Sequence, residues 1–343
     1  MKFLPYSNGV RKVNMQKELK PEHIIRLVII AIVSIFILGF IVQSISNFIA
    51  KETLKQRVDY TTVNDLRLDY RLKGSGNYTV VFDASLGGNL EQWTPVIEKL
   101  EDLNVQTFVY NRRGYGYSSS GSRITPEEQA QDLKILLRKA GLSAPYILVG
   151  EEYGSLVLTS FAKQYPDAVS GVVLIDPINE EDIKEKDYKK KQTINKIRRK
   201  IENIGSNFAF TMLLDKLNLD IPFNDFEEGL KSKEALHEFK THRTKNSYTK
   251  AVYNETVNLI NGQSNTQEEG VFTGKPYYLL TKNNDDRLKV LGDEQFTKVY
   301  NTTCTKDVLA LNDTENVFNA IADVVSTLEK MDLQEKLVKL NNQ

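Results

Sequence analysis

Cysteine and histidine are scarce in this chain, and this scarcity narrows the chemistry that it can carry. Cys304 is the only cysteine among 343 residues, which excludes an internal disulfide framework and any cysteine-based metal cluster. Histidine, a frequent general base and metal ligand, occurs only at His23, His237 and His242. We therefore predict neither a metal site nor a cofactor.

Net charge is also lacking, because 45 Lys and Arg residues are balanced by 45 Asp and Glu residues. The chain therefore has no overall electrostatic field that would attract a nucleic acid or an acidic partner, and we expect no nucleic acid to bind. The hydrophobic fraction of 41% is enough to bury a large core. At this length, one domain with an inserted cap is a better expectation than two independent domains.

One long stretch near the N-terminus lacks charge altogether. Residues 27–42 contain no charged side chain and apolar residues continue to Ile49, which reaches the roughly 20 residues that a membrane-spanning helix needs. We predict a transmembrane helix over 27–49. A cleaved signal peptide is the competing interpretation, but its apolar core is usually only about 7–15 residues long, with small residues before the cleavage site.

Basic residues are distributed unequally around this span. Lys51, Lys55 and Arg57 follow it, whereas a larger set precedes it: Lys2, Arg11, Lys12, Lys17, Lys20 and Arg26. The positive-inside bias therefore predicts that residues 1–26 are cytoplasmic. It also predicts a single-pass protein of the cell membrane whose main domain is extracellular.

Beyond the span, strand patterns alternate with helix patterns. Thr125, Pro126 and Glu128 form the N-terminal capping signature of a helix that ends at Gly141. Such alternation predicts an α/β architecture with a mostly parallel sheet, whose ligands bind at the carboxyl ends of the strands. The predicted strands are 58–60, 66–70, 78–82, 105–110, 146–149, 172–176, 277–281 and 307–311.

The segment around residue 152 has the frame of a nucleophile elbow. The apolar run 146–149 leads through a glycine-framed turn directly into a helical pattern. In a Gly-x-Ser-x-Gly elbow, the middle residue lies on a strained turn and the next backbone N–H points at the developing oxyanion. Here the frame runs from Gly150 to Gly154, and its middle residue is Glu152.

Four motifs together resemble the α/β-hydrolase fold superfamily, nearest to its membrane-anchored bacterial members. They are a glycine-rich loop, an Asp-Arg-x-Gly-Tyr-Gly-x-Ser type of loop, the elbow and a Val-Leu-Ile-Asp strand end, at 80–88, 111–118, 146–154 and 173–176. The resemblance implies an α/β-hydrolase core formed by 58–177 and 271–335. It also implies a helical cap insertion over 178–270.

The same resemblance indicates that the catalytic serine is replaced. The family's serine corresponds to Glu152, and the histidine that often precedes it corresponds to Glu151. Tyr153 completes the elbow and would supply one oxyanion N–H. The oxyanion loop corresponds to the segment that contains Ser85 and Leu86.

The same comparison indicates that the histidine of the triad is also replaced, whereas an aspartate still occupies the region of the acid. The family's histidine follows the last strand, for which we predict 307–311, and its position corresponds to Asn312 or Asp313. The acid position, after the strand 277–281, corresponds to Asp285 or Asp286.

Two interpretations of Glu152 remain open. Carboxylates at a helix N-terminus are favoured by the helix dipole and its unpaired N–H groups, and this explains Glu151 as well. Alternatively, the Glu152 carboxylate folds onto the oxyanion donors and fills the former pocket. A third role, as a nucleophile like the aspartate of some family members, fits less well because glutamate is one methylene longer and no histidine activates water.

His237 and His242 lie in the predicted cap and superficially resemble the zinc motif His-Glu-x-x-His. Their spacing is one residue too long, because five residues on a helix turn the two imidazoles roughly 140° apart. We expect two exposed cap histidines. A base that reaches down from the cap is the alternative.

The cap also contains a basic amphipathic segment at 186–204. Its isoleucines recur at helical spacing, at Ile194, Ile197, Ile201 and Ile204. Such a pattern predicts a solvated basic face over a small core. Contact with an anionic lipid or cell-envelope polymer is the other interpretation.

These observations leave two functions. The first is a membrane-tethered, catalytically silent hydrolase-fold protein that binds a small molecule, a lipid or a protein partner. The alternative is an atypical ester or amide hydrolase with Glu152 or Glu151 as the base, Asp285 or Asp286 as its partner and a cap histidine as a possible further base.

Overall fold

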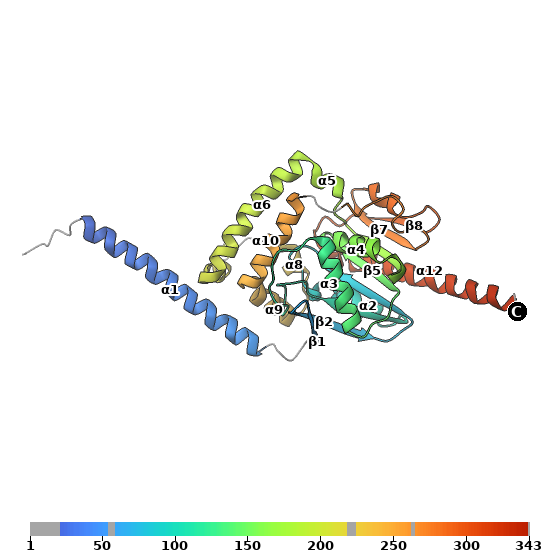
Figure 1. The fold of residues 1–343 in the computed structure, drawn as a ribbon, viewed down its shortest axis with the longest axis horizontal. Coiled ribbons are helices and arrows are strands. Elements are labelled where there is room, and N and C mark those ends of the chain that lie inside the picture. Colours follow the sequence, from blue (N-terminus) through green and yellow to red (C-terminus); the bar gives the residue numbers. More distant parts are fainter. Residues whose placement is uncertain (1–20, 54–58, 218–223, 262–264, 342–343) are drawn as a thin grey trace, which may run out of the picture.

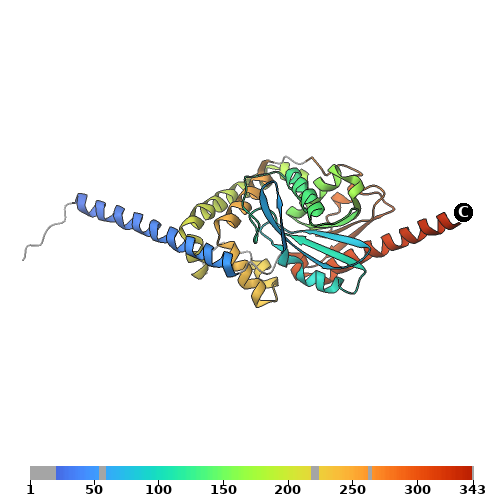
Figure 2. The same cartoon turned by 60° about the horizontal axis from the view of Figure 1, so that its bottom comes forward.

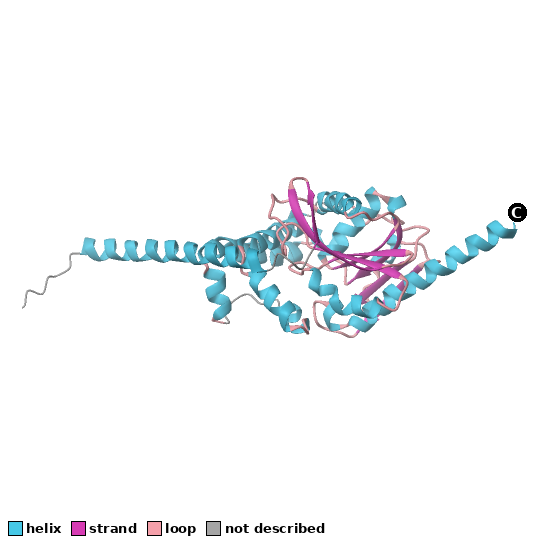
Figure 3. Ribbon diagram, turned by 90° about the horizontal axis from the view of Figure 1, so that it is seen from below, coloured by secondary structure: helices cyan, strands magenta, loops and turns pink. Residues whose placement is uncertain are grey.

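The computed structural model describes residues 21–53, 59–217, 224–261 and 265–341. A twisted sheet forms its centre, helices cover both faces of the sheet, and a long helix projects at each end (Figure 1, Figure 3). The helices outside the cap are α1 (Pro21–Thr53), η1 (Leu90–Trp93), α2 (Thr94–Leu100), α3 (Pro126–Lys139), α4 (Tyr153–Gln164), η2 (Pro166–Ala168), η4 (Arg287–Leu291), α11 (Leu309–Asn312) and α12 (Thr314–Asn341).

Among the described residues, the sheet contains eight strands in the order β1-β2-β4-β3-β5-β6-β7-β8. The pairs β1–β2 and β2–β4 are antiparallel and the others are parallel, as the alternation of strands and helices predicts. The strands are β1 (Asp59–Val63), β2 (Leu66–Gly74), β3 (Tyr78–Asp83), β4 (Val105–Tyr110), β5 (Tyr146–Glu151), β6 (Val169–Ile175), β7 (Tyr277–Lys282) and β8 (Thr297–Thr302).

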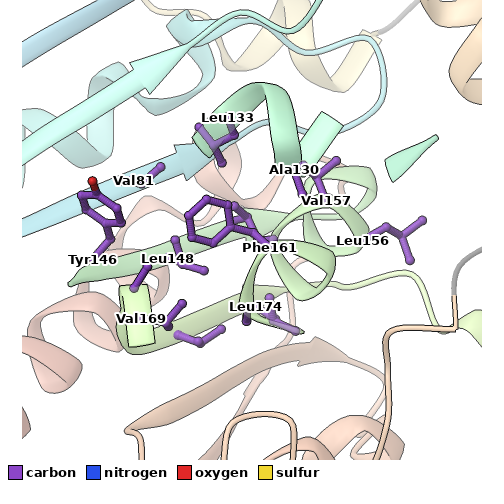
Figure 4. Packing of buried hydrophobic residues seen from close by; sticks show 14 of the residues in the cluster. Val81, Ala130, Leu133, Tyr146, Leu148, Leu156, Val157, Phe161, Val169 and Leu174 are labelled. Atoms are coloured by element: carbon purple, nitrogen blue, oxygen red, sulfur yellow. The ribbon is translucent and has the colours of Figure 1, made fainter. Parts of the chain in front are cut away.

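The central strands are apolar on both faces because helices cover both sides of the sheet. In β5, Leu148 belongs to the core shared with α3 and α4, whereas Ile147 and Val149 belong to the core shared with α2 and α12. Successive side chains of a strand point to opposite faces, so a strand buried on both faces needs an uninterrupted apolar run. Figure 4 shows the first core, in which Leu148 lies beside Phe161 of α4.

The last predicted strand, 307–311, is wrong. Leu309–Asn312 form the short helix α11, and the eighth strand is β8, which comes earlier in the chain. A short apolar run does not distinguish a buried strand from a buried helical turn. Among the described strands, the edge strand β8 pairs only with β7. It is largely exposed, so polar residues are allowed there and conceal its strand pattern.

The cap helices follow β6 in the chain and lie to one side of the sheet (Figure 1). The basic segment forms α6, but the expectation that its isoleucines cover a small core is wrong. Ile194, Ile197, Ile201 and Ile204 are all more than half exposed. The cap contains α5 (Glu180–Lys184), α6 (Lys186–Gly205), η3 (Ser206–Phe208), α7 (Phe210–Lys216), α8 (Asn224–Gly229), α9 (Lys233–Arg243) and α10 (Asn246–Asn261).

The turn between β5 and α4 packs closely against the end of β3. A Cβ atom at Gly154 would lie 2.3 Å from the carbonyl oxygen of Asp83 and 2.9 Å from that of Ala84. Both contacts are with backbone atoms at the end of a central strand, which cannot shift without disturbing the sheet. The elbow glycine is therefore required by packing, whatever residue occupies the nucleophile position.

We expect Gly154→Ala to lower the free energy of unfolding by about 3 kcal/mol or more, because the added methyl group must displace backbone. Gly141→Ala is the matched control: its Cβ meets nothing within 4 Å, but its φ of +80° is unfavourable, so it should cost about 1–2 kcal/mol. Chemical denaturation of the full chain in detergent measures both losses. Equal losses would contradict the packing explanation.

Candidate functional site

The candidate site lies at the carboxyl ends of β3, β5 and β6. Glu152 connects β5 to α4 with φ 47° and ψ −110°, a left-handed backbone conformation that costs a non-glycine residue energy. This strained conformation places the side chain at the crest of the turn, as in a nucleophile elbow. The turn therefore has the backbone geometry of a nucleophile elbow, with Glu152 at its crest.

The Glu152 carboxylate points toward the loop that follows β3. Its Oε2 atom accepts a hydrogen bond of 2.7 Å from the backbone N–H of Leu86. Burial raises the pKa of Glu152 to about 7, and hydrogen bonds from the backbone N–H groups of Leu86 and Tyr153 oppose this rise. These two N–H groups are the donors that the elbow and the oxyanion loop would offer to an oxyanion.

Glu151 is fully buried beneath the elbow and has donors of its own. It accepts hydrogen bonds from Gln92 Nε2 at 2.7 Å and from the backbone N–H groups of Leu309 and Ala310 at 2.5 and 3.3 Å. Burial raises its pKa to about 8, and the two backbone donors partly offset that rise. Glu151 therefore ties the elbow to α11, the helix that replaces the expected last strand.

Arg112 is a site residue that the sequence analysis did not single out. Its buried guanidinium forms ion pairs with Asp83 at the end of β3 and with Glu255 of α10, the latter at 2.7 Å. It also donates hydrogen bonds to the carbonyl oxygens of Ala84 and Ser85, at 2.7 and 3.1 Å. The loop that carries Leu86 is thus held between the sheet and the cap.

Two tyrosines complete this buried network. Tyr110 donates a hydrogen bond of 2.6 Å to Asp83, and Tyr115 donates one of 2.6 Å to Glu255. Burial raises the pKa of Asp83, whereas the Arg112 guanidinium lowers it. The sequence offers little sign of the network, because Glu255 lies 143 positions after Arg112.

The position expected for the catalytic histidine is occupied by structural contacts. Asn312 donates a hydrogen bond of 2.8 Å to the carbonyl oxygen of Val308, and Asp313 accepts hydrogen bonds from Thr302 and Asn316. The described loop between β8 and α12 contains no histidine. Asn312 and Asp313 therefore support the start of α12.

The two cap histidines differ in burial, so the expectation that both are exposed is wrong for one of them. His237 is exposed, whereas His242 is 2% exposed and packs edge-on against Tyr117, with ring centroids 4.4 Å apart. Burial lowers the pKa of His242 to about 3, and the nearby Lys245 lowers it further. Among the described residues, no hydrogen bond joins a histidine to Glu152.

The expected acid positions form surface ion pairs. Asp285 pairs with Arg287 and Asp286 with Lys289, each at 2.6 Å. A different acid, Asp176, follows β6 with a φ of 41°, and its charge raises the pKa of both elbow glutamates. Asp176 is the last residue of the Val-Leu-Ile-Asp motif and directly follows β6, the strand that pairs with β5. This position is the sequence signal that would have identified it as a site residue.

The potential metal ligands do not gather into a site. Within the parts of the chain that the structure describes, no three His, Cys, Asp or Glu side chains are grouped so that they could hold a metal ion. The elbow carboxylates and Asp176 instead meet backbone N–H groups, Gln92 and Lys282. Their arrangement can hold or exchange a proton but contains no paired nucleophile and histidine.

The strand order and the elbow define the class of protein. A family model for the alpha/beta hydrolase fold matches residues 78–288, which is more than half of the chain. The chain therefore belongs to the α/β-hydrolase fold family.

Solved structures share the fold at low sequence identity. The Cif epoxide hydrolase from Acinetobacter nosocomialis is similar with a TM-score of 0.63 and 15% identity, covering 82% of this chain and 96% of that protein. The enol-lactonase from Burkholderia xenovorans LB400 is similar with a TM-score of 0.56 and 16% identity, covering 78% and 100%. At these identities the similarity concerns the fold alone.

Two curated relatives match shorter segments. The uncharacterized protein YqjL of Bacillus subtilis is 34% identical over 106 residues, which are 31% of this chain and 42% of that protein. The dihydrolipoyllysine-residue acetyltransferase component of the acetoin cleaving system of Cupriavidus necator is 28% identical over 120 residues, covering 35% and 32%. The chain thus spans less than half the length of each of these relatives.

The raised pKa of Glu151 makes a prediction about pH. Below pH 4.5, the ordinary pKa of a glutamate, the Glu151 carboxyl is protonated in both the folded and the unfolded chain. Between pH 4.5 and about 8, the unfolded chain releases this proton but the folded protein keeps it. Stability therefore falls as the pH rises through this range. Because Glu151→Gln cannot titrate, its free energy of unfolding should fall less than that of the wild type, by on the order of 4 kcal/mol.

Urea denaturation at a series of pH values measures this difference in slope. Glu269→Gln is a suitable control because that carboxylate is exposed at the surface. It should keep the wild-type slope. A Glu151→Gln slope that matches the wild type would show that Glu151 is ionised at neutral pH in the folded protein.

Proposed function

We propose that this chain is a membrane-anchored α/β-hydrolase-fold protein without hydrolase turnover, which binds a small molecule, a lipid or a protein partner through the inherited cleft or its cap. The observation that carries the proposal is the hydrogen bond from the Leu86 N–H to the Glu152 carboxylate. A side chain of the protein itself holds the donor that a substrate oxyanion would need.

Three features of the elbow disfavour acyl transfer. Glu152 cannot act as a serine nucleophile, and an ester of its carboxylate would need an activated water for release. The position of the activating histidine is held by Asn312 and Asp313, and His242 is buried against Tyr117 instead. Removal of one oxyanion-hole donor typically lowers kcat by about 100- to 1,000-fold.

The membrane anchor in the proposal is α1. Its segment Pro21–Ile49 is long and apolar enough to cross a bilayer, and none of its most apolar window is buried in the protein. We infer an uncleaved single span with a cytoplasmic N-terminus and an extracellular main domain, on the basis of the basic residues before the span. A signal sequence would pass the same test, and the intact mass of the membrane-bound protein distinguishes the two.

An atypical hydrolase remains the second candidate, for a specific reason. Burial raises the pKa of Glu152 to about 7, the range in which a general base is effective near neutral pH. In this mechanism Glu152 would take a proton from water, and the charge of Asp176 would favour that uptake. The attacked carbonyl would then have to displace the Glu152 carboxylate from the Leu86 N–H.

We expect the purified full chain to remain unlabelled by a fluorophosphonate probe and to leave a panel of short acyl esters unhydrolysed, since both reactions need an activated nucleophile and a free oxyanion hole. Labelling on gels and ester release by absorbance measure these outcomes. Robust turnover that Glu152→Gln abolishes would establish the second candidate and reject the first.

The single substitution Glu152→Ser should not create an esterase, because the serine would still lack a base. Ester release should stay at the level of Glu152→Ala, a matched variant that also empties the oxyanion hole but has no hydroxyl. Thermal unfolding of both variants verifies that they are folded. Efficient hydrolysis by Glu152→Ser but not by Glu152→Ala would reveal a base in the pocket and contradict the proposal.

A further inference from the structure

The helix α6 is amphipathic, and its apolar side faces away from the protein. Ile194, Ile197, Ile201 and Ile204 are 55%, 56%, 59% and 54% exposed, and no residue of α6 is fully buried. Polar groups make the contacts near its C-terminal end: Asn246 of α10 donates a hydrogen bond of 3.1 Å to the carbonyl oxygen of Asn203. This is the reverse of the usual arrangement in a soluble protein, in which the apolar side of a helix packs against the core.

The next helix extends this apolar surface. Phe210, Leu213 and Leu217, in or just after α7, are 46%, 51% and 55% exposed. We name these three residues and the four isoleucines of α6 the α6–α7 face. Covering such side chains is favourable because it removes apolar surface from water, and a large exposed apolar patch marks an interaction site.

The apolar helix α1 reaches the cap at the connection between α6 and α7. The rings of Phe36 in α1 and Phe208 in η3 are in edge contact, with centroids 4.9 Å apart. Gly39 lies so close that a Cβ there would be 2.2 Å from the carbonyl oxygen of Phe208. Figure 1 and Figure 2 show the cap beside the second half of α1, while its first half projects away from the protein.

The depth of this contact along α1 indicates what covers the α6–α7 face. The continuous apolar run of α1 ends at Val42, and Gln43, which donates a hydrogen bond to Asn47, is 3% exposed. With α1 as the proposed anchor, the bilayer boundary therefore lies near Gln43, ahead of the predicted end of the span at Ile49. Gly39 precedes Gln43 by four residues, or about 6 Å at 1.5 Å per residue. Amphipathic helices that lie on membranes bury their apolar face by about 5–10 Å, so the contact is at the corresponding level.

The charges of α6 are arranged as a membrane surface would require. Long basic side chains flank the isoleucines and precede them, at Lys186, Lys189, Lys190, Lys191, Lys196, Arg198 and Lys200. Such side chains can keep their charged ends among phosphate groups while their stems lie along apolar surface. Each is attracted electrostatically to an anionic membrane surface.

We propose that the α6–α7 face inserts into the outer part of the lipid bilayer beside α1, so that the cap lies on the membrane rather than at the end of a free tether. The occupant of the face is phospholipid, with anionic headgroups at the basic side chains. This inference rests on the proposed anchoring by α1. It adds a second, interfacial membrane contact that orients the whole domain.

Site-directed fluorescence in the full chain tests the proposal. In a Cys304→Ser background, single substitutions Ile201→Cys and Leu213→Cys carry an environment-sensitive nitrobenzoxadiazole label, and the protein is reconstituted in vesicles of phosphatidylcholine and phosphatidylglycerol. We expect blue-shifted emission that lipids with a doxyl group near the carbonyl end quench strongly. Water-like emission without quenching at both positions would overturn the proposal.

Two further labels make the result unambiguous. Val290→Cys is the matched control, because Val290 is 48% exposed on η4 of the core and should not be quenched. Ile35→Cys reports the anchor, because Ile35 is 69% exposed on α1. Quenching at Ile35 but not at Ile201 would reject the cap contact and leave the anchor standing. No quenching at Ile35 would reject the anchor itself. Blue-shifted emission at Ile201 without lipid quenching would show that protein rather than lipid surrounds the label and would also overturn the proposal.

Discussion

The buried guanidinium of Arg112 is the interaction on which the candidate site depends. It joins Asp83 at the end of β3, the carbonyl oxygens of the following loop and Glu255 of the cap. A buried ion pair that loses one partner typically costs about 3–5 kcal/mol, so the three segments are held in one arrangement. The position of the Leu86 N–H, and with it the contact to Glu152, follows from this arrangement.

Two neighbouring carboxyl groups coexist at the elbow because they use separate sets of donors. Glu152 accepts from the Leu86 N–H, whereas Glu151 accepts from Gln92 and from the first N–H groups of α11. Burial still raises the pKa of both, to about 7 and about 8. A hydrolase directs the same kind of donors at a transition-state charge; here they stabilise side chains that are part of the fold.

The proposed membrane contact would also orient the candidate site. The cap lies over the loop that carries Leu86, since Glu255 of α10 pairs with Arg112 and Tyr248 donates a hydrogen bond of 2.8 Å to the carbonyl oxygen of Gly87. In the proposed arrangement the other side of the same cap contacts lipid. The candidate site would then lie on the side of the cap that faces away from the bilayer surface.

Much of the fold was predictable because strands buried on both faces leave a local pattern in the sequence, and β3 to β7 follow it. The strand predicted at 307–311 was wrong because a short apolar run also suits the buried helix α11, and the burial of His242 depends on packing that no local pattern records. The sequence by itself determined that a glutamate stands at the crest of a hydrolase-type elbow. Only the tertiary structure decided that its carboxylate lies on the N–H of Leu86, 66 positions earlier, because the parallel pairing of β3 with β5 brings these two loops together.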